Sequence, residues 1–111
     1  IDYKSGRAPG RARALQLPVY GRCAEQELAG RHGSSWRLDE AAYVAFGEAR
    51  GWVPLDRRQE MATALADGQA RFVEAVDDIE RGGFPPRPAE PYRCVFCDYP
   101  TVCRKDYVGD E

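Results

Sequence analysis

The sequence Ile-Asp-Tyr-Lys-Ser-Gly at residues 1–6 decides how the rest of the chain is interpreted. Side chains alternate along a β-strand, so Asp2 and Lys4 should point to one face while Ile1 and Tyr3 point to the other. The Ser-Gly pair after them ends the strand and leaves the acid and the amine near its carboxyl edge. A carboxylate there can bind a hard cation such as Mg²⁺, and an adjacent ammonium can position a water or neutralise charge on a phosphate. An isolated Asp-x-Lys is more often a solvated surface pair, so its interpretation depends on the motifs in residues 7–111.

Length and composition are those of a single globular domain with a modest core. The chain has 111 residues, of which 43% are hydrophobic and 31% charged, which argues against disorder. It contains neither an apolar run near the roughly 20 residues of a membrane helix nor a signal-peptide pattern, so we expect a cytoplasmic protein without a membrane partner. The net charge of −2 means that any contact with nucleic acid must be local. Residue 1 is not Met and lies in a strand that needs a pairing partner, so we expect a carboxy-terminal part of a longer protein.

Residues 7–13 carry the Pro-Gly pattern of a loop and three arginines, Arg7, Arg11 and Arg13. Their guanidinium groups could meet phosphates where the chain passes the acid–amine pair. The alternative is a mobile surface loop.

Residues 15–29 are expected to form a helix with Leu15, Val19 and Cys23 on its buried stripe. Pro18 would lie in the first turn, where a missing N–H costs little, and Gly30 would end the helix.

Gln16 and Tyr20 are four residues apart and therefore share one face of this helix. An amide and a hydroxyl placed side by side could hold a nucleotide base, a phosphate or the ammonium of Lys4.

Two further elements are indicated by the pattern of apolar residues. Residues 41–47 are typical of a strand, and residues 57–81 of a long amphipathic helix that serves packing and carries no chemistry. Asp56 and Gln59 resemble a capping box at its start. His32 precedes a Gly-Ser-Ser turn and is expected to be a solvated loop residue.

Residues 84–111 form a Pro-rich, extended segment that leads into a cysteine-rich tail. Three cysteines fall within ten residues of this tail: Cys94, Cys97 and Cys103. Such clustering in a cytoplasmic chain favours metal or cluster ligation over disulfides. The fourth ligand could be Cys23, His32 in a structural zinc site, or a residue outside this chain. We favour a small buried thiol as the state of Cys23.

Three motifs occur together and in order: Ile-Asp-Tyr-Lys-Ser-Gly, Leu-Gln-Leu-Pro-Val-Tyr, and Cys-x-x-Cys-x-x-x-x-x-Cys. The set resembles the RecB-type branch of the PD-(D/E)XK nuclease superfamily, most closely the carboxy-terminal nuclease domain of AddB-like helicase–nuclease subunits, whose cysteines hold a 4Fe-4S cluster. The resemblance covers nearly the whole chain. It implies an α/β fold, namely the carboxy-terminal portion of a restriction-endonuclease-like fold, with short strands flanked by two helices and a cysteine-bound tail.

By position, the resemblance implies that Asp2 is a Mg²⁺ ligand and Lys4 the catalytic lysine, and that Gln16 and Tyr20 form the family's Gln-x-x-x-Tyr motif. Cys94, Cys97 and Cys103 correspond to the clustered 4Fe-4S ligands, whereas Cys23 does not match the family's first cluster cysteine. The implied activity is Mg²⁺-dependent exonucleolytic cleavage of DNA by a deoxyribonuclease. The implied context is an ATP-dependent helicase–nuclease of recombinational DNA repair, with a helicase subunit or fused helicase domain as partner.

The earlier acidic or His motif of the family, and a strand with another metal-binding Asp, would precede Ile1. One carboxylate is a poor Mg²⁺ site, so we expect the 111 residues alone to lack nuclease activity. Two alternatives remain open: a non-catalytic DNA-binding or scaffolding module held by the cluster, and an interaction domain stapled by Zn²⁺.

Overall fold

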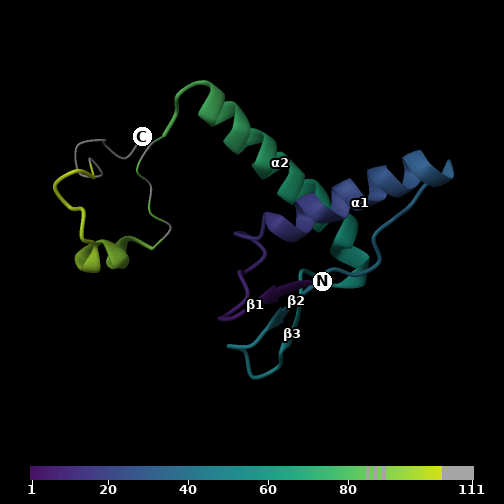
Figure 1. Cartoon of the computed structure of the whole chain (residues 1–111), viewed down its shortest axis with the longest axis horizontal. Coiled ribbons are helices and arrows are strands. Elements are labelled where there is room, and N and C mark those ends of the chain that lie inside the picture. Colours follow the sequence, from purple (N-terminus) through teal and green to yellow (C-terminus); the bar gives the residue numbers. More distant parts are fainter. Residues whose placement is uncertain (85, 87, 89, 104–111) are drawn as a thin grey trace. The chain divides into compact units, whose positions relative to one another are not determined.

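The computed structural model describes residues 1–84, 86, 88 and 90–103. The chain divides into two units, residues 1–76 and residues 77–111, and each is treated by itself. The first unit contains the sheet, the first helix and most of the second helix (Figure 1). Part of the predicted tail, at residues 85, 87, 89 and 104–111, lies outside the described residues.

The first unit contains a three-stranded sheet made of β1 (Asp2–Lys4), β2 (Ala42–Ala45) and β3 (Trp52–Pro54), in that order. Strands β1 and β2 run parallel, and β2 and β3 antiparallel. Both expected strands are present but shorter than residues 1–6 and 41–47. The third strand was not predicted, because its three residues end in a proline and acquire strand geometry only by pairing with β2.

The first helix, α1 (Gln16–His32), runs past the predicted stop at Gly30 and ends at Gly33. Gly33 adopts a left-handed conformation (φ 65°), and its N–H bonds to the Ala29 carbonyl at 2.9 Å. This is the usual glycine C-cap, which Gly30 does not form because the helix is still regular there. His32 is therefore the last residue of the helix, and its ring lies 5.8 Å from that of Trp36.

The buried face of α1 differs from the predicted stripe. Leu17, Pro18 and Gly21 are buried, whereas Leu15 is 37% exposed and Cys23 is exposed. The expectation of a buried Cys23 thiol is therefore wrong. The error arose because neither Pro nor Gly counts as apolar in a helical pattern, although small or flat residues permit close helix packing.

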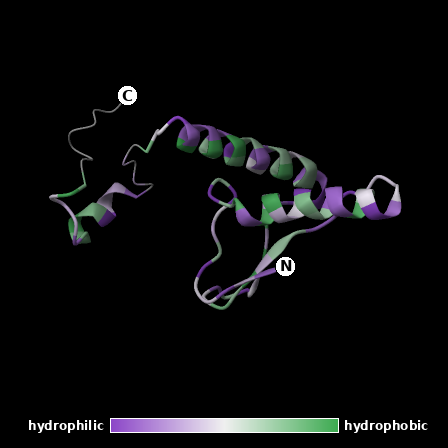
Figure 2. Cartoon of the chain, turned by 45° about the horizontal axis from the view of Figure 1, so that its top comes forward, coloured by the Kyte–Doolittle hydropathy of each residue, from purple (hydrophilic) through white to green (hydrophobic). Residues whose placement is uncertain are grey.

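The second helix, α2 (Met61–Glu80), follows a 3₁₀ turn at Arg58–Glu60. The predicted capping box is absent: the turn has Arg57 at its N-cap, and Asp56 Oδ1 instead accepts the N–H of Arg57 at 2.8 Å. Polar and apolar residues alternate around both helices (Figure 2). In α2 the buried residues lie in the first half, and in the second half apolar side chains such as Phe72 and Val73 are nearly half exposed.

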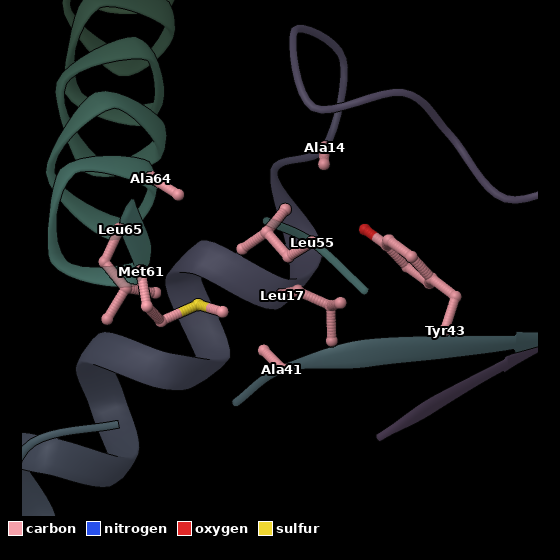
Figure 3. Packing of buried hydrophobic residues seen from close by; sticks show 8 residues of the cluster. All are labelled: Ala14, Leu17, Ala41, Tyr43, Leu55, Met61, Ala64 and Leu65. Carbon is pink, nitrogen blue, oxygen red and sulfur yellow. The ribbon is translucent and has the colours of Figure 1, made fainter. Parts of the chain in front are cut away.

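The hydrophobic core of the first unit lies between α1, α2 and one face of the sheet. Its buried members are Ala14, Leu17, Ala41, Tyr43, Leu55, Met61, Ala64 and Leu65 (Figure 3). Helices α1 and α2 approach closely where Gly68 meets Pro18 and where Gly21 meets Leu65. On the other face of the sheet, Tyr3 is 68% exposed and Trp52 46% exposed, so neither belongs to this core.

The second unit begins with the last residues of α2, which ends near Gly82 (φ 73°). Its other described element is a 3₁₀ segment, η2 (Pro91–Phe96), directly before the second clustered cysteine. Among the described residues of the whole chain, no helix is both long and apolar enough to span a bilayer.

Candidate active site

The acid and the amine of β1 lie together on the face of the sheet that carries the core. Lys4 Nζ is 2.9 Å from Asp2 Oδ2, and the two side chains are only 31% and 19% exposed. Strand alternation explains this arrangement, since Tyr3 between them points away and is largely exposed. The parallel register then places Asp2 beside Tyr43 and Lys4 beside Ala45 of β2.

Helix α1 supplies two further polar side chains to the same place. Lys4 Nζ donates a hydrogen bond to Gln16 Oε1 at 2.7 Å, and Gln16 Nε2 donates to the Tyr20 hydroxyl at 3.0 Å. The four candidate residues therefore form one continuous chain of contacts from the strand to the helix. Because Gln16 is the first residue of α1, its position depends directly on where that helix begins.

The direction of these hydrogen bonds determines which protons remain for a ligand. A lysine ammonium has three donors, of which Gln16 engages one, and Asp2 lies beside the ammonium as its ion-pair partner. The Tyr20 hydroxyl accepts from Gln16, which leaves its own hydrogen to donate, and Tyr20 is 53% exposed. The centre thus offers two donors, an ammonium N–H and a phenolic O–H, which suit an anionic ligand.

The close contact with the Asp2 carboxylate raises the pKa of Lys4 above its ordinary value of 10.5, although partial desolvation acts in the opposite direction. Lys4 is therefore an ammonium ion throughout the neutral range. It can donate hydrogen bonds and stabilise negative charge, but it cannot accept a proton from water.

Tyr43 is a buried residue of the site that lies against Lys4, and the sequence pattern did not identify it. Lys4 Nζ lies 5.7 Å from the centre of its ring, and the residue is 1% exposed. Burial raises the pKa of Tyr43, and its buried hydroxyl has no hydrogen-bond partner among the described residues. The sequence could have indicated Tyr43 as an inward-facing aromatic residue of the strand that pairs with β1. Recognising it required the register between the two strands.

The donors around Asp2 meet only part of what Mg²⁺ needs. Asp2 Oδ2 is buried, faces Lys4 and receives no well-directed hydrogen bond from the part of the chain that the structure describes. A hard oxygen of this kind suits Mg²⁺ as one ligand. Among the described residues, however, no three His, Cys, Asp or Glu side chains gather into a metal site. Asp2 therefore fits as a single protein ligand, and water, substrate or other residues must complete the coordination.

The clustered cysteines lie around the end of η2. Cys94 is partly buried, and Cys97 and Cys103 are exposed. Cys97 Sγ accepts the backbone N–H of Tyr99 at 3.4 Å. The donor set suits a thiophilic metal or a cluster, although the three sulfurs are not gathered into a site within residues 90–103.

All three loop arginines are exposed, but Arg11 and Arg13 are already engaged in interactions. Arg11 forms ion pairs with Asp56 and, at 2.8 Å, with Asp67, so its guanidinium is used within the fold. Arg13 is also engaged in an interaction of its own. Arg7 is exposed as well and could serve the predicted phosphate contact.

A strand-borne acid and ammonium, joined to an amide and a hydroxyl on the next helix, define a centre suited to phosphodiester hydrolysis, that is, a nuclease. A family model described as the PD-(D/E)XK nuclease superfamily matches residues 1–104, and the chain belongs to that superfamily. No curated protein and no solved structure matches the chain significantly.

Proposed function

We propose that this chain carries the catalytic lysine of a Mg²⁺-dependent DNA exonuclease, within an ATP-dependent helicase–nuclease of recombinational DNA repair. The observation that carries the nuclease part is the continuous contact from Asp2 through Lys4 and Gln16 to Tyr20. Support for the exonuclease and for a helicase partner comes from the ordered motifs and their resemblance to AddB-like nuclease domains.

In this proposal Asp2 provides one oxygen ligand for Mg²⁺, and the ion supplies Lewis-acid polarisation of the scissile phosphate and a more acidic water. Lys4 is an ammonium ion, so its role is to donate to the attacking water or to the phosphoryl oxygens as negative charge develops. Tyr20 donates to a neighbouring phosphate oxygen. Gln16 fixes both groups, because its amide accepts from one and donates to the other.

The single carboxylate limits what these residues can do by themselves. Mg²⁺ normally keeps several waters but still takes one or two carboxylates together with substrate phosphates. We therefore propose that residues 1–111 alone do not cleave DNA and that further acidic residues of the complete protein finish the metal site. A non-catalytic DNA-binding module remains the alternative, and it would show DNA affinity without cleavage even in the complete protein.

We further propose that Cys94, Cys97 and Cys103 are three ligands of a 4Fe-4S cluster whose role is structural. Support comes from their spacing and from the N–H···S contact at Cys97. Zn²⁺ is the alternative occupant, which iron and zinc analysis of anaerobically purified protein would distinguish.

The test is a cleavage assay on the complete protein with Lys4→Ala. Cleavage of labelled linear DNA in Mg²⁺ should fall at least about 100-fold, because an ammonium that meets transition-state charge is lost. The brown colour should be retained. Arg50→Ala, which removes an exposed cation from the turn between β2 and β3, is the matched control and should cleave normally. Wild-type cleavage by Lys4→Ala would rule out the proposed centre.

A further inference from the structure

The loop before α1 is held by one side chain of α2. Arg71 Nη1 donates to the Ala12 carbonyl at 2.6 Å, and Arg71 Nη2 donates to the carbonyls of Ala14 at 2.9 Å and Arg11 at 3.1 Å. Three acceptors of an irregular segment are thereby satisfied by a single guanidinium. A planar fork with five N–H donors suits this geometry, whereas an ammonium is a point donor and cannot reproduce it.

A second contact joins the same loop to α2, and here the loop supplies the arginine and the helix supplies the acceptor. Arg11, from the loop, pairs with Asp67 at 2.8 Å, and Asp67 lies one turn before Arg71 on α2. Between them, Gly68 packs against Pro18 of α1 so closely that a side chain there would clash. Residues 67, 68 and 71 of α2 thus contact both the loop and the start of α1.

This contact region lies next to the candidate active site along the chain. Ala14, whose carbonyl Arg71 binds, is two residues before Gln16, and Gln16 is the first residue of α1. The hydrogen bond from Lys4 to Gln16 is 2.7 Å long, so a displacement of α1 by about 1 Å would break it. Anything that fixes residues 11–14 therefore fixes the amide that orients the ammonium.

We propose that Arg71 is a positioning residue for the nuclease centre, acting through the 11–14 loop on Gln16 and thereby on Lys4. The inference rests on the proposed function, but it concerns a residue that touches neither the four candidate residues nor a substrate. It also gives α2, whose sequence pattern predicts packing alone, a defined role in the geometry of the site.

The test compares Arg71→Lys and Arg71→Met with Arg31→Gln, which breaks an exposed ion pair to Glu27 (2.7 Å) at the far end of α1. In the complete protein, kcat for Mg²⁺-dependent DNA cleavage should fall at least about 10-fold in both Arg71 variants, since misplacement by about 1 Å can cost ~10²-fold. KM for DNA should change less than kcat, because no DNA contact is removed. Arg71→Lys should not rescue, and Arg31→Gln should cleave normally.

A spectroscopic measurement on the chain separates this proposal from the function on which it rests. The side-chain amide resonances of Gln16, followed by ¹⁵N NMR, should shift in Arg71→Lys at a temperature where the variant is folded, and should not shift in Arg31→Gln. If the wild-type protein cleaves no DNA but this shift occurs, the proposed function fails and the positioning role stands. Unchanged Gln16 resonances, or an unchanged kcat in folded Arg71→Lys, would overturn the positioning role.

Discussion

Replacing Gly68 by alanine tests the closest contact between the two helices. A Cβ built at Gly68 lies 2.5 Å from Pro18 Cγ, whereas ordinary van der Waals contact begins at 3.4 Å. The two helices must therefore separate by about 1 Å, because the proline ring is buried and cannot rotate away. Overpacking of this kind costs about 1–3 kcal/mol. The alanine also favours the helix by about 0.5–1 kcal/mol, so we expect a net loss of up to about 2.5 kcal/mol.

The assay is urea unfolding of the chain followed by circular dichroism, with Gly30→Ala as the matched control. Gly30 lies in α1 and has open space within 4 Å of the position of a Cβ. The same substitution there should leave stability unchanged or raise it by up to about 1 kcal/mol. If Gly68→Ala proves as stable as Gly30→Ala, the helices do not meet at Pro18, and the placement of Gln16 derived from that contact is wrong.

Three further predictions concern alkaline pH, the loop and the tail. Burial raises the pKa of Tyr43 above 10.0, so the unfolded chain loses the phenolic proton first as the pH rises. The free energy of unfolding of the wild type should therefore fall between about pH 9 and about pH 11. It should fall less in Tyr43→Phe, which has no phenolic proton at this position. Arg11→Gln should lower the free energy of unfolding by about 0.5–1 kcal/mol through loss of its ion pairs, whereas Arg7→Gln should leave it within about 0.5 kcal/mol; equal effects in urea unfolding would contradict this assignment. In anaerobically purified complete protein, Cys97→Ser should lose iron and brown colour while Cys23→Ser keeps both, and loss of iron from Cys23→Ser would instead make Cys23 a ligand.

Local periodicity places the candidate residues in two pairs, whereas their assembly into one site was implied only by the family resemblance. Alternation along a strand places Asp2 and Lys4 on one face, and a spacing of four places Gln16 and Tyr20 on another. Neither the strand alternation nor the helical spacing predicts that the face of β1 and the face of α1 come into contact. That meeting depends on contacts distant in sequence, such as Arg71 with Ala14 and Gly68 with Pro18, which carry no repeating pattern.

The wrong prediction of a buried Cys23 and the failure to predict strand β3 both arise from contacts distant in sequence. Cys23 was expected inside because it falls on an apolar stripe with Val19, yet the helix is buried through Pro18 and Gly21, where small or flat surfaces allow α2 to approach. Strand β3 is only three residues long and has no recognisable strand pattern, so it adopts strand geometry through its pairing with β2.

The central claim is that Asp2 and Lys4 form a metal-assisted nuclease centre. The most direct measurement is the rate of DNA cleavage by the complete protein with Asp2→Asn as the Mg²⁺ concentration is raised. This isosteric change removes the charge that binds the ion and holds the ammonium, so the rate should remain at least about 100-fold below wild type even at saturating Mg²⁺. Cleavage by Asp2→Asn at the wild-type rate would contradict the claim.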